Sequence, residues 1–232
     1  MRPSLRLLSF AALVATTACG ESSSPAAPEA PALGSPRSQV LSGEAQQAIA
    51  GADAKDTLAV QFFSASGAPL AGTPVTWSTT GGKLALQTST TDANGIARTT
   101  IKADTKIGTS FVKATAGGAE ASFVLFVNAG EPAAFEAMAM RTDTLTLDGA
   151  FSGAPARVFD AFRNPVGGTL VSVAIFEGDA AEPASTLTLQ ADETGAVRLP
   201  FSPISAPGRV RVVYTAGETS LDYSFVVLEI AP

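Results

Sequence analysis

The chain has 232 residues, a net charge of −6, one cysteine and no histidine. A single cysteine excludes an intramolecular disulfide, and the lack of histidine excludes the usual zinc sites and the Ser-His and Cys-His nucleophile pairs. Lysine and arginine are scattered rather than clustered, so the basic stripe that nucleic acid requires is missing and we expect no nucleic-acid partner. Many Gly, Ala, Thr and Val residues, with few aromatics other than Phe, are typical of an all-β protein.

The first residues have the pattern of an export signal. Arg2 and Arg6 precede an apolar run, Leu7–Val14, which is too short to span a bilayer as a helix. The residues that follow, Thr16–Gly20, resemble the cleavage site of bacterial lipoproteins. This resemblance implies that residues 1–18 are a removed signal peptide and that Cys19 carries a lipid. The alternative is ordinary secretory cleavage, which would leave the same cysteine as a free thiol.

Residues 19–38 are rich in Ser, Ala and Pro and contain little that could form a core. We predict a disordered tether that proline biases toward an extended conformation. A lipid on Cys19 would make the membrane a partner and would hold the following domains in the cell envelope, at the outer membrane or the cell surface.

The segment Thr91–Thr100 combines a tight turn with the start of a strand. Asp92 can bond its own backbone two residues on, and Asn94 and Gly95 are the residue types that tolerate positive φ best. We therefore predict a β-hairpin here.

This turn and an earlier one recur in the second half of the chain, which indicates two copies of one domain. The equivalent residues are Pro69 and Pro165, Gly72 and Gly168, Asp92 and Asp192, and Gly95 and Gly195.

From residue 39 onward, short alternating runs are separated by Gly, Pro and Asn, which predicts two tandem β-sandwich domains at 39–129 and 130–232. In each copy the last two strands keep the same alternation, which assigns their core faces. The expected strands are 57–64, 73–78, 84–88, 96–102, 109–115 and 121–127, then 144–147, 156–161, 169–176, 186–190, 196–201, 209–215 and 221–228. The expected core residues of the last two strands are Val112, Ala114, Phe123, Leu125 and Val127, then Val210, Val212, Tyr214, Tyr223, Phe225 and Val227.

Three stretches of the first copy, Gly67–Trp77, Thr91–Ala97 and Val112–Thr115, resemble the bacterial immunoglobulin-like domain of group 1 (Big-1), which is repeated in invasin and intimin adhesins. The resemblance implies immunoglobulin-like sandwiches, with the second copy divergent because Val173 stands where Trp77 stands in the first. We expect Trp77 to fill the core between the sheets.

Few side chains are candidates for chemistry, and each has a plainer structural explanation. Three acidic residues of the first copy could bind calcium, but their spacing favours turn and surface roles. An acidic loop in the second copy could bind a cation or a basic partner, although solvated charge explains it as well. Four phenylalanines could form a platform for a sugar or peptide if they lay together, but core packing is the alternative. These sets are Asp53, Asp56 and Asp92; Glu177, Asp179 and Glu182; and Phe63, Phe151, Phe162 and Phe176. Arg209 and Arg211 are expected on the exposed face of their strand.

We expect a protein that is not an enzyme and needs no cofactor or metal, although a glycosidase-like carboxylate pair stays open. The favoured hypothesis is an exported lipoprotein that displays its domains for surface display, adhesion or envelope interaction. The alternative is a periplasmic scaffold or accessory subunit that binds a protein or glycan through loops of the second domain.

Overall fold

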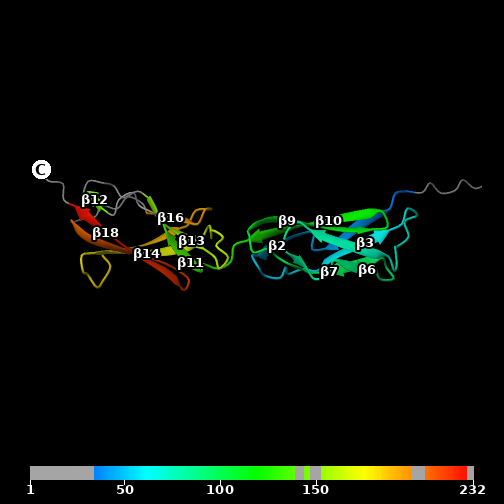
Figure 1. Cartoon of the computed structure of the whole chain (residues 1–232), viewed down its shortest axis with the longest axis horizontal. Coiled ribbons are helices and arrows are strands. Elements are labelled where there is room, and N and C mark those ends of the chain that lie inside the picture. Colours follow the sequence, from blue (N-terminus) through cyan, green and yellow to red (C-terminus); the bar gives the residue numbers. More distant parts are fainter. Residues whose placement is uncertain (1–33, 139–143, 147–152, 200–206, 229–232) are drawn as a thin grey trace, which may run out of the picture. The chain divides into compact units, whose positions relative to one another are not determined.

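The computed structural model of the chain describes residues 34–138, 144–146, 153–199 and 207–228, and the residues from Gly34 onward group as one compact unit (Figure 1). The described residues form strands joined by turns, with no helix among them, which confirms the all-β prediction. Within this part of the chain, accordingly, no helix has the length and apolar character needed to cross a bilayer. The predicted signal peptide, Cys19 and most of the predicted tether lie outside the described residues.

The first sandwich has one sheet in the order β1-β3-β7 and a larger one in the order β2-β10-β9-β4-β6, with β5 and β8 forming a separate pair. Its strands are β1 Arg37–Ser42, β2 Ala45–Ile49, β3 Leu58–Phe63, β4 Pro74–Thr79, β5 Lys83–Leu84, β6 Thr88–Thr90, β7 Ile96–Thr99, β8 Ile101–Lys102, β9 Gly108–Ala116 and β10 Ala119–Asn128.

The second sandwich repeats this arrangement, with one sheet in the order β11-β13-β16 and one in the order β12-β18-β17-β14-β15. Even the parallel pairing of β2 with β10 has its counterpart in β12 with β18. The strands are β11 Ala134–Ala137, β12 Thr144–Thr146, β13 Gly153–Phe159, β14 Leu170–Glu177, β15 Ser185–Gln190, β16 Ala196–Leu199, β17 Gly208–Ala216 and β18 Thr219–Leu228. The exact domain boundaries, 39–129 and 130–232, stay predictions.

Each sandwich has its own hydrophobic core, built from the inward side chains of facing sheets. The expected alternation of the last two strands is confirmed, because the predicted inward residues of β9, β10 and β17 are all buried. In β18, Phe225 and Val227 are buried while Tyr223 is half-buried and packs at the edge of the core. Burial of these apolar side chains is the main source of stability in domains that have no disulfide.

Three strands were not expected from the sequence: β1, β2 and β11. β1 begins at Arg37, so the last two residues of the predicted tether belong to a strand. Its alternation is weak because Val40 is its only residue packed against the described core. Likewise, Gln46 of β2 is polar yet buried, since its amide bonds the backbone N–H and C=O of Asp56.

The strand expected at 84–88 is two shorter strands instead. β5 pairs with β8, whereas β6 pairs with β4 in the larger sheet. The chain therefore changes partners between these strands, and residues 85–87 are exposed. Alternation alone does not reveal such a crossing, because the buried Leu84 fits either interpretation.

The expected β-hairpin at Thr91–Thr100 is wrong. β6 and β7 lie in different sheets, so the turn carries the chain from one sheet to the other. Gly95 takes a φ of 74°, but Asn94 does not take a positive φ, so the turn that an Asn-Gly hairpin requires is absent. The turn itself was predicted correctly, and Ala97 is buried and Arg98 exposed as expected. The single strand expected at 96–102 is wrong, because β7 ends at Thr99 and pairs with β3, whereas β8 pairs with β5.

The two cores place their largest side chain on different strands. In the first sandwich Trp77 of β4 faces Ala114 of β9 in register, and in the second Val173 of β14 faces Tyr214 of β17. All four side chains are buried. Trp77 packs against Phe123 with ring centroids 5.9 Å apart, and Tyr214 packs against Phe135 at 6.3 Å. The large and small members of one cross-strand pair have thus changed places.

Candidate functional site

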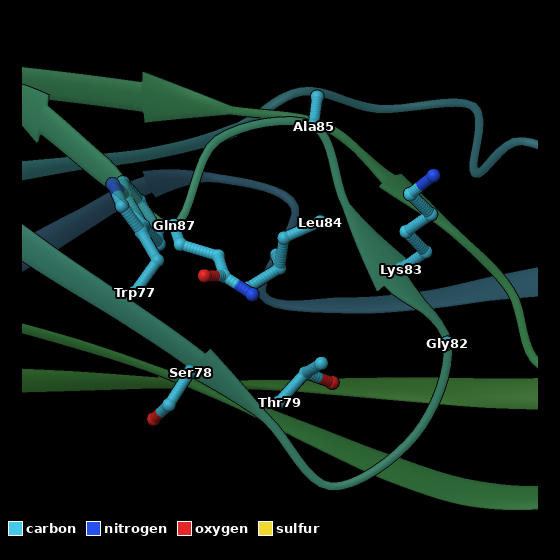
Figure 2. Close-up of a pocket in the computed structure, with 8 residues that line it drawn as sticks. All are labelled: Trp77, Ser78, Thr79, Gly82, Lys83, Leu84, Ala85 and Gln87. Atoms are coloured by element: carbon cyan, nitrogen blue, oxygen red, sulfur yellow. The ribbon is translucent and has the colours of Figure 1, made fainter.

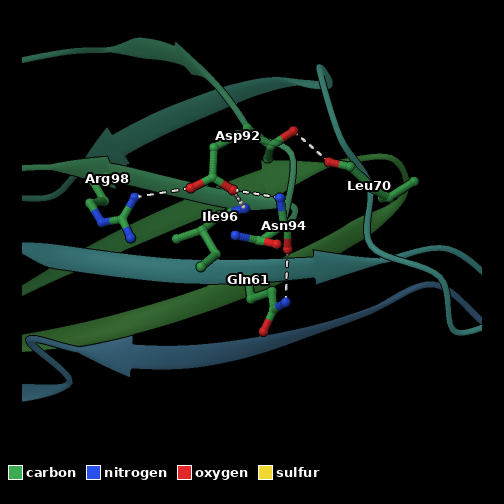
Figure 3. A network of polar contacts seen from close by, with 7 residues as sticks. Gln61, Leu70, Asp92, Asn94, Ile96 and Arg98 are labelled. Carbon is green, nitrogen blue, oxygen red and sulfur yellow. Dashed lines mark hydrogen bonds and ion pairs between the residues drawn. The ribbon is translucent and has the colours of Figure 1, made fainter.

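Asp92 organises the turn between the sheets of the first sandwich (Figure 3). Its Oδ1 accepts hydrogen bonds from the backbone N–H groups of Asn94 at 2.8 Å and Ile96 at 3.0 Å, and its Oδ2 lies 3.3 Å from Nη1 of Arg98. The Ile96 N–H, then the Asn94 N–H and Arg98, hold the pKa of Asp92 below its ordinary value of 3.8. All of its neighbours belong to the turn or the next strand, which assigns Asp92 a structural role.

Asp192 repeats this geometry in the second sandwich. Its Oδ1 accepts the Thr194 N–H at 2.8 Å and the Ala196 N–H at 3.0 Å, and Arg198 lies 3.6 Å from its Oδ2. The Thr194 hydroxyl, followed by these backbone groups, lowers the pKa of Asp192. Gly195 takes the same φ of 74° as its counterpart in the first sandwich, and a Cβ at this position would meet the Val158 carbonyl oxygen. Both turns therefore require Asp and Gly for structural reasons.

The other predicted turn residues also form matching pairs. Pro69 forms an isolated β-bridge with Phe63, and Pro165 forms the matching one with Phe159. Gly72 has a φ of 62° and donates its N–H to Thr91, while Gly168 has a φ of 77° and donates to Ala191. The predicted motif residues thus shape the fold rather than gather at a ligand site.

An open hollow of about 600 Å³ lies beside Trp77, where the chain crosses between sheets (Figure 2). The indole is itself buried and donates from Nε1 to the Ser89 hydroxyl at 2.9 Å. Lys83 supplies the charge at the rim, Trp77 and Leu84 are the large apolar lining residues, and the others are small or polar: Ser78, Thr79, Gly82, Ala85 and Gln87. Lys83 is the one ionisable residue among those that line the hollow, so these residues supply no acid–base pair.

The acidic candidates do not form a metal site. The backbone of Asp53 forms an isolated β-bridge with Lys102, and the backbone of Asp56 is hydrogen-bonded by Gln46. The carboxylate of Asp92 is bonded within its own turn. In the second sandwich Asp179 and Glu182 are exposed on the β14–β15 loop. Across the described ranges, no three Asp, Glu, Cys or His side chains are placed to share a cation.

The candidate aromatic platform is not assembled by the described phenylalanines. Phe63 lies under the Arg37 guanidinium at 4.9 Å, and Phe176 lies under Arg211 at 4.1 Å in the other sandwich. Phe162 is on a loop and 47% exposed, and Phe151 lies outside the described residues. Each described ring therefore has a local role.

Arg209 is exposed, as expected, whereas Arg211 is half-buried and has a specific role. Besides covering Phe176, the Arg211 guanidinium lies 3.5 Å from the carboxylate of Asp222 on β18. These contacts tie neighbouring strands together, so the pair does not form a free basic surface.

Sequence reasoning missed Asp160 and Asn164, which are buried although they lie on the β13–β14 loop. Asp160 Oδ2 accepts the Gly130 N–H at 3.0 Å and the Asn164 side-chain amide at 2.9 Å. Burial alone would raise the pKa of Asp160, but the Asn164 amide and backbone N–H groups outweigh it and lower the pKa. The sequence did contain a signal for them. When this loop is aligned with 64–69 of the first copy, Asp160 and Asn164 fall opposite Ser64 and Ala68.

Residues 38–125 match the family model of the bacterial Ig-like domain (group 1). The match covers most of the first sandwich, which is therefore similar to that family. The resemblance predicted from Gly67–Trp77 and the two shorter stretches is thereby confirmed. None of the curated proteins matches the chain.

Among solved structures, the Yersinia pseudotuberculosis adhesin InvE is 16% identical with a TM-score of 0.38, over 82% of this chain and 58% of that one. A C-terminal fragment of intimin, solved with the intimin-binding domain of its translocated receptor, is 17% identical with a TM-score of 0.37, over 81% and 62%. Invasin, described as a bacterial integrin-binding protein, is 21% identical with a TM-score of 0.35, over 84% and 40%. The chain thus spans less than two thirds of the length of these structures, and the likeness concerns the fold.

Proposed function

We propose that the protein is an exported, lipid-anchored protein that displays its Ig-like domains outside the cell and acts without catalysis, in adhesion or in contacts of the cell envelope. The observation that carries this proposal is the position of Cys19. The only cysteine of the chain directly follows an export-signal pattern and precedes a Pro-rich segment that leads into an Ig-like domain. A lipid at this position would be the anchor, and the segment would be the spacer.

The energetics of lipidation support stable attachment. A buried acyl chain contributes roughly 0.8 kcal/mol per CH₂ group, and two or more chains hold a protein on a bilayer where one binds only marginally. The bacterial lipoproteins whose signals this one resembles carry a diacylglycerol on the cysteine. Attachment through Cys19 would therefore need no transmembrane segment.

A binding role, rather than catalysis, is supported by the surface of the first domain. The hollow at Trp77 has a single ionisable lining residue, Lys83, and its other lining residues are uncharged, with the apolar Trp77 and Leu84 among them. Ig-like sandwiches hold such surfaces on a rigid framework, which is suited to recognition or to spacing.

Replacement of Cys19 by Ser tests the anchor. We expect the variant to move from the membrane fraction to the soluble fraction after export, because the serine cannot form the thioether. Ser24→Ala in the same segment is the matched control and should stay with membranes. Unchanged membrane retention of Cys19→Ser would contradict the proposal.

A further inference from the structure

The β13–β14 loop of the second sandwich and the corresponding loop of the first have the same backbone but different side chains. In the first, Ser64 donates its N–H to the Ala68 carbonyl at 2.8 Å, and in the second Asp160 donates to Asn164 at 2.9 Å. Gly67 has a φ of 83°, and its counterpart Arg163 has a φ of 68°. Since the backbone needs neither Asp nor Asn, these side chains serve another purpose.

The Asn164 side chain reaches the first sandwich. Its Oδ1 accepts the backbone N–H of Ile107 at 3.2 Å, and its Nδ2 donates to the Thr105 carbonyl at 2.7 Å. One carboxamide therefore pairs with a donor and an acceptor of the β8–β9 loop, as a neighbouring backbone would. Ala68, in the same place in the first sandwich, can make neither bond.

Asp160 holds this carboxamide in place. Its Oδ1 accepts the N–H groups of Phe162 and Asn164, both at 2.8 Å, while its Oδ2 accepts the Asn164 amide and the Gly130 N–H. Gly130 lies between the last strand of the first sandwich and the first of the second. Both oxygens of one buried carboxylate thus tie the loop, the connecting segment and Asn164 together.

Phe162 adds a second contact with the first sandwich, and Arg163 is held by residues of the second sandwich. Phe162 lies over Gly51 of the first sandwich, where a Cβ would come within 2.5 Å of the ring. Arg163 is the one non-glycine residue with positive φ in the described ranges, a conformation that L residues rarely adopt. Its guanidinium is held by Glu136 at 3.0 Å and covers the Phe159 ring at 4.7 Å.

We propose that Asp160–Asn164 is a docking loop, and that the surface formed by Gly51, Thr105 and Ile107 of the first domain is its receptor. The loop couples the two domains, so that they move as one body instead of turning freely about the connecting segment. The loop differs from 64–68 at four positions. Of these, Asn164 and Phe162 contact the first domain, Asp160 holds Asn164 and the connecting segment, and Arg163 packs within the second domain. The inference does not depend on the lipid anchor or on adhesion.

Amide hydrogen exchange in the full chain, resolved by NMR, tests the docking directly. Asn164→Ala is expected to raise the exchange rate of the Ile107 N–H by about tenfold, because a hydrogen bond of ordinary strength is lost. The Val112 N–H in the core of the first domain and the Val212 N–H in the core of the second should keep their rates. Asn94→Ala, a loop asparagine of the first domain, is the matched control and should leave Ile107 unchanged.

Phe162→Ala provides a second test that leaves the buried Asp160–Asn164 pair in place. This side chain is 47% exposed, so its removal is compatible with folding, and we expect a smaller acceleration at Ile107 of about threefold. Unchanged exchange at Ile107 in both variants would overturn the proposal. So would equal acceleration of Ile107 and Val212 in Asn164→Ala, because Asn164 would then act only by stabilising its own domain.

Discussion

The two sandwiches have the same strand order and the same turns but fill their cores in opposite ways. The first places its bulk on β4, as Trp77, opposite Ala114, and the second places it on β17, as Tyr214, opposite Val173. Because a sandwich core is close-packed, a large side chain can change strands only if its partner shrinks. Each sandwich thus combines one large and one small side chain at this pair, and the strand that carries the large one differs.

The two large residues also differ in how their polar atoms are treated. The Trp77 Nε1 donates to Ser89, whereas the Tyr214 hydroxyl is buried without a hydrogen-bond partner among the described residues. Leaving a buried hydroxyl unpaired costs free energy that an apolar ring would not. We therefore expect the large residue of the second core to stabilise its domain less than Trp77 stabilises the first.

The largest effect is expected from Trp77→Ala. Deleting a buried Trp creates a cavity and should lower the free energy of unfolding of the first domain by about 3 to 5 kcal/mol. The matched change in the second domain, Val173→Ala, should cost about 2 kcal/mol because fewer carbons are removed. Denaturant titration followed by exchange of the Val112 and Val212 amides assigns each loss to its domain; equal losses for the two variants would contradict the comparison.

The exchanged pair can be transplanted. Trp77→Val and Ala114→Tyr should each destabilise the first domain, one by leaving a cavity and the other by overpacking. The double variant should be more stable than the sum of the single effects predicts, by about 1 to 3 kcal/mol. A double-mutant cycle by urea denaturation measures this coupling, and simple additivity would show that the two cores are not related by exchange at this pair.

Tyr214→Phe should leave the second domain equally stable or stabilise it by up to about 1 kcal/mol, since the unpaired hydroxyl is removed. Burial, and then the nearby Tyr223, raises the pKa of Tyr214 well above its ordinary value of 10.0. As the pH rises above 10.0, Tyr214 ionises in the unfolded chain before it does in the folded one, so the free energy of unfolding falls. The loss of stability at alkaline pH should thus be smaller in the Tyr214→Phe variant than in the wild type. A marked loss of stability of the variant at pH 7 would contradict the expectation, because it would reveal a hydrogen bond to the hydroxyl.

The smallest effect is expected at the turns. The pKa of Asp92 is lowered on folding, so the stability it contributes is present above its unfolded value of 3.8 and is lost as the pH falls toward the folded value. Asp92→Asn should weaken this acid dependence for the first domain, and Asp192→Asn should do the same for the second. Thermal unfolding between pH 5 and pH 2 measures both, and identical acid profiles for wild type and variants would rule out these contributions.

Much of the fold was predictable because turns and alternation are local signals. Asp92, Gly95 and their counterparts mark the same crossing in both copies, and the alternation of β9 and β10 gives their inward faces. The prediction of a hairpin at Thr91–Thr100 was wrong, because β7 pairs with β3, which is distant in sequence, and not with the preceding strand. The same reason explains the division of 84–88 into two strands.

The side chains between the domains could not be found by local patterns. Asp160 and Asn164 occupy a polar loop that is typical of an exposed turn, and only their contacts with Gly130, Thr105 and Ile107 bury them. Such burial depends on the placement of a second domain, which a single loop sequence does not encode. The role of Cys19 stays a prediction, since it lies outside the described residues.

Display outside the cell is tested most directly by placing a tag after Pro232 and adding protease to intact cells, with a periplasmic protein as the control for leakage. We predict that the tag is removed while the periplasmic control survives, because the domains would project from the outer surface on their lipid anchor. Protection of the tag until the envelope is opened would contradict display and would favour a scaffold that binds its partner inside the envelope.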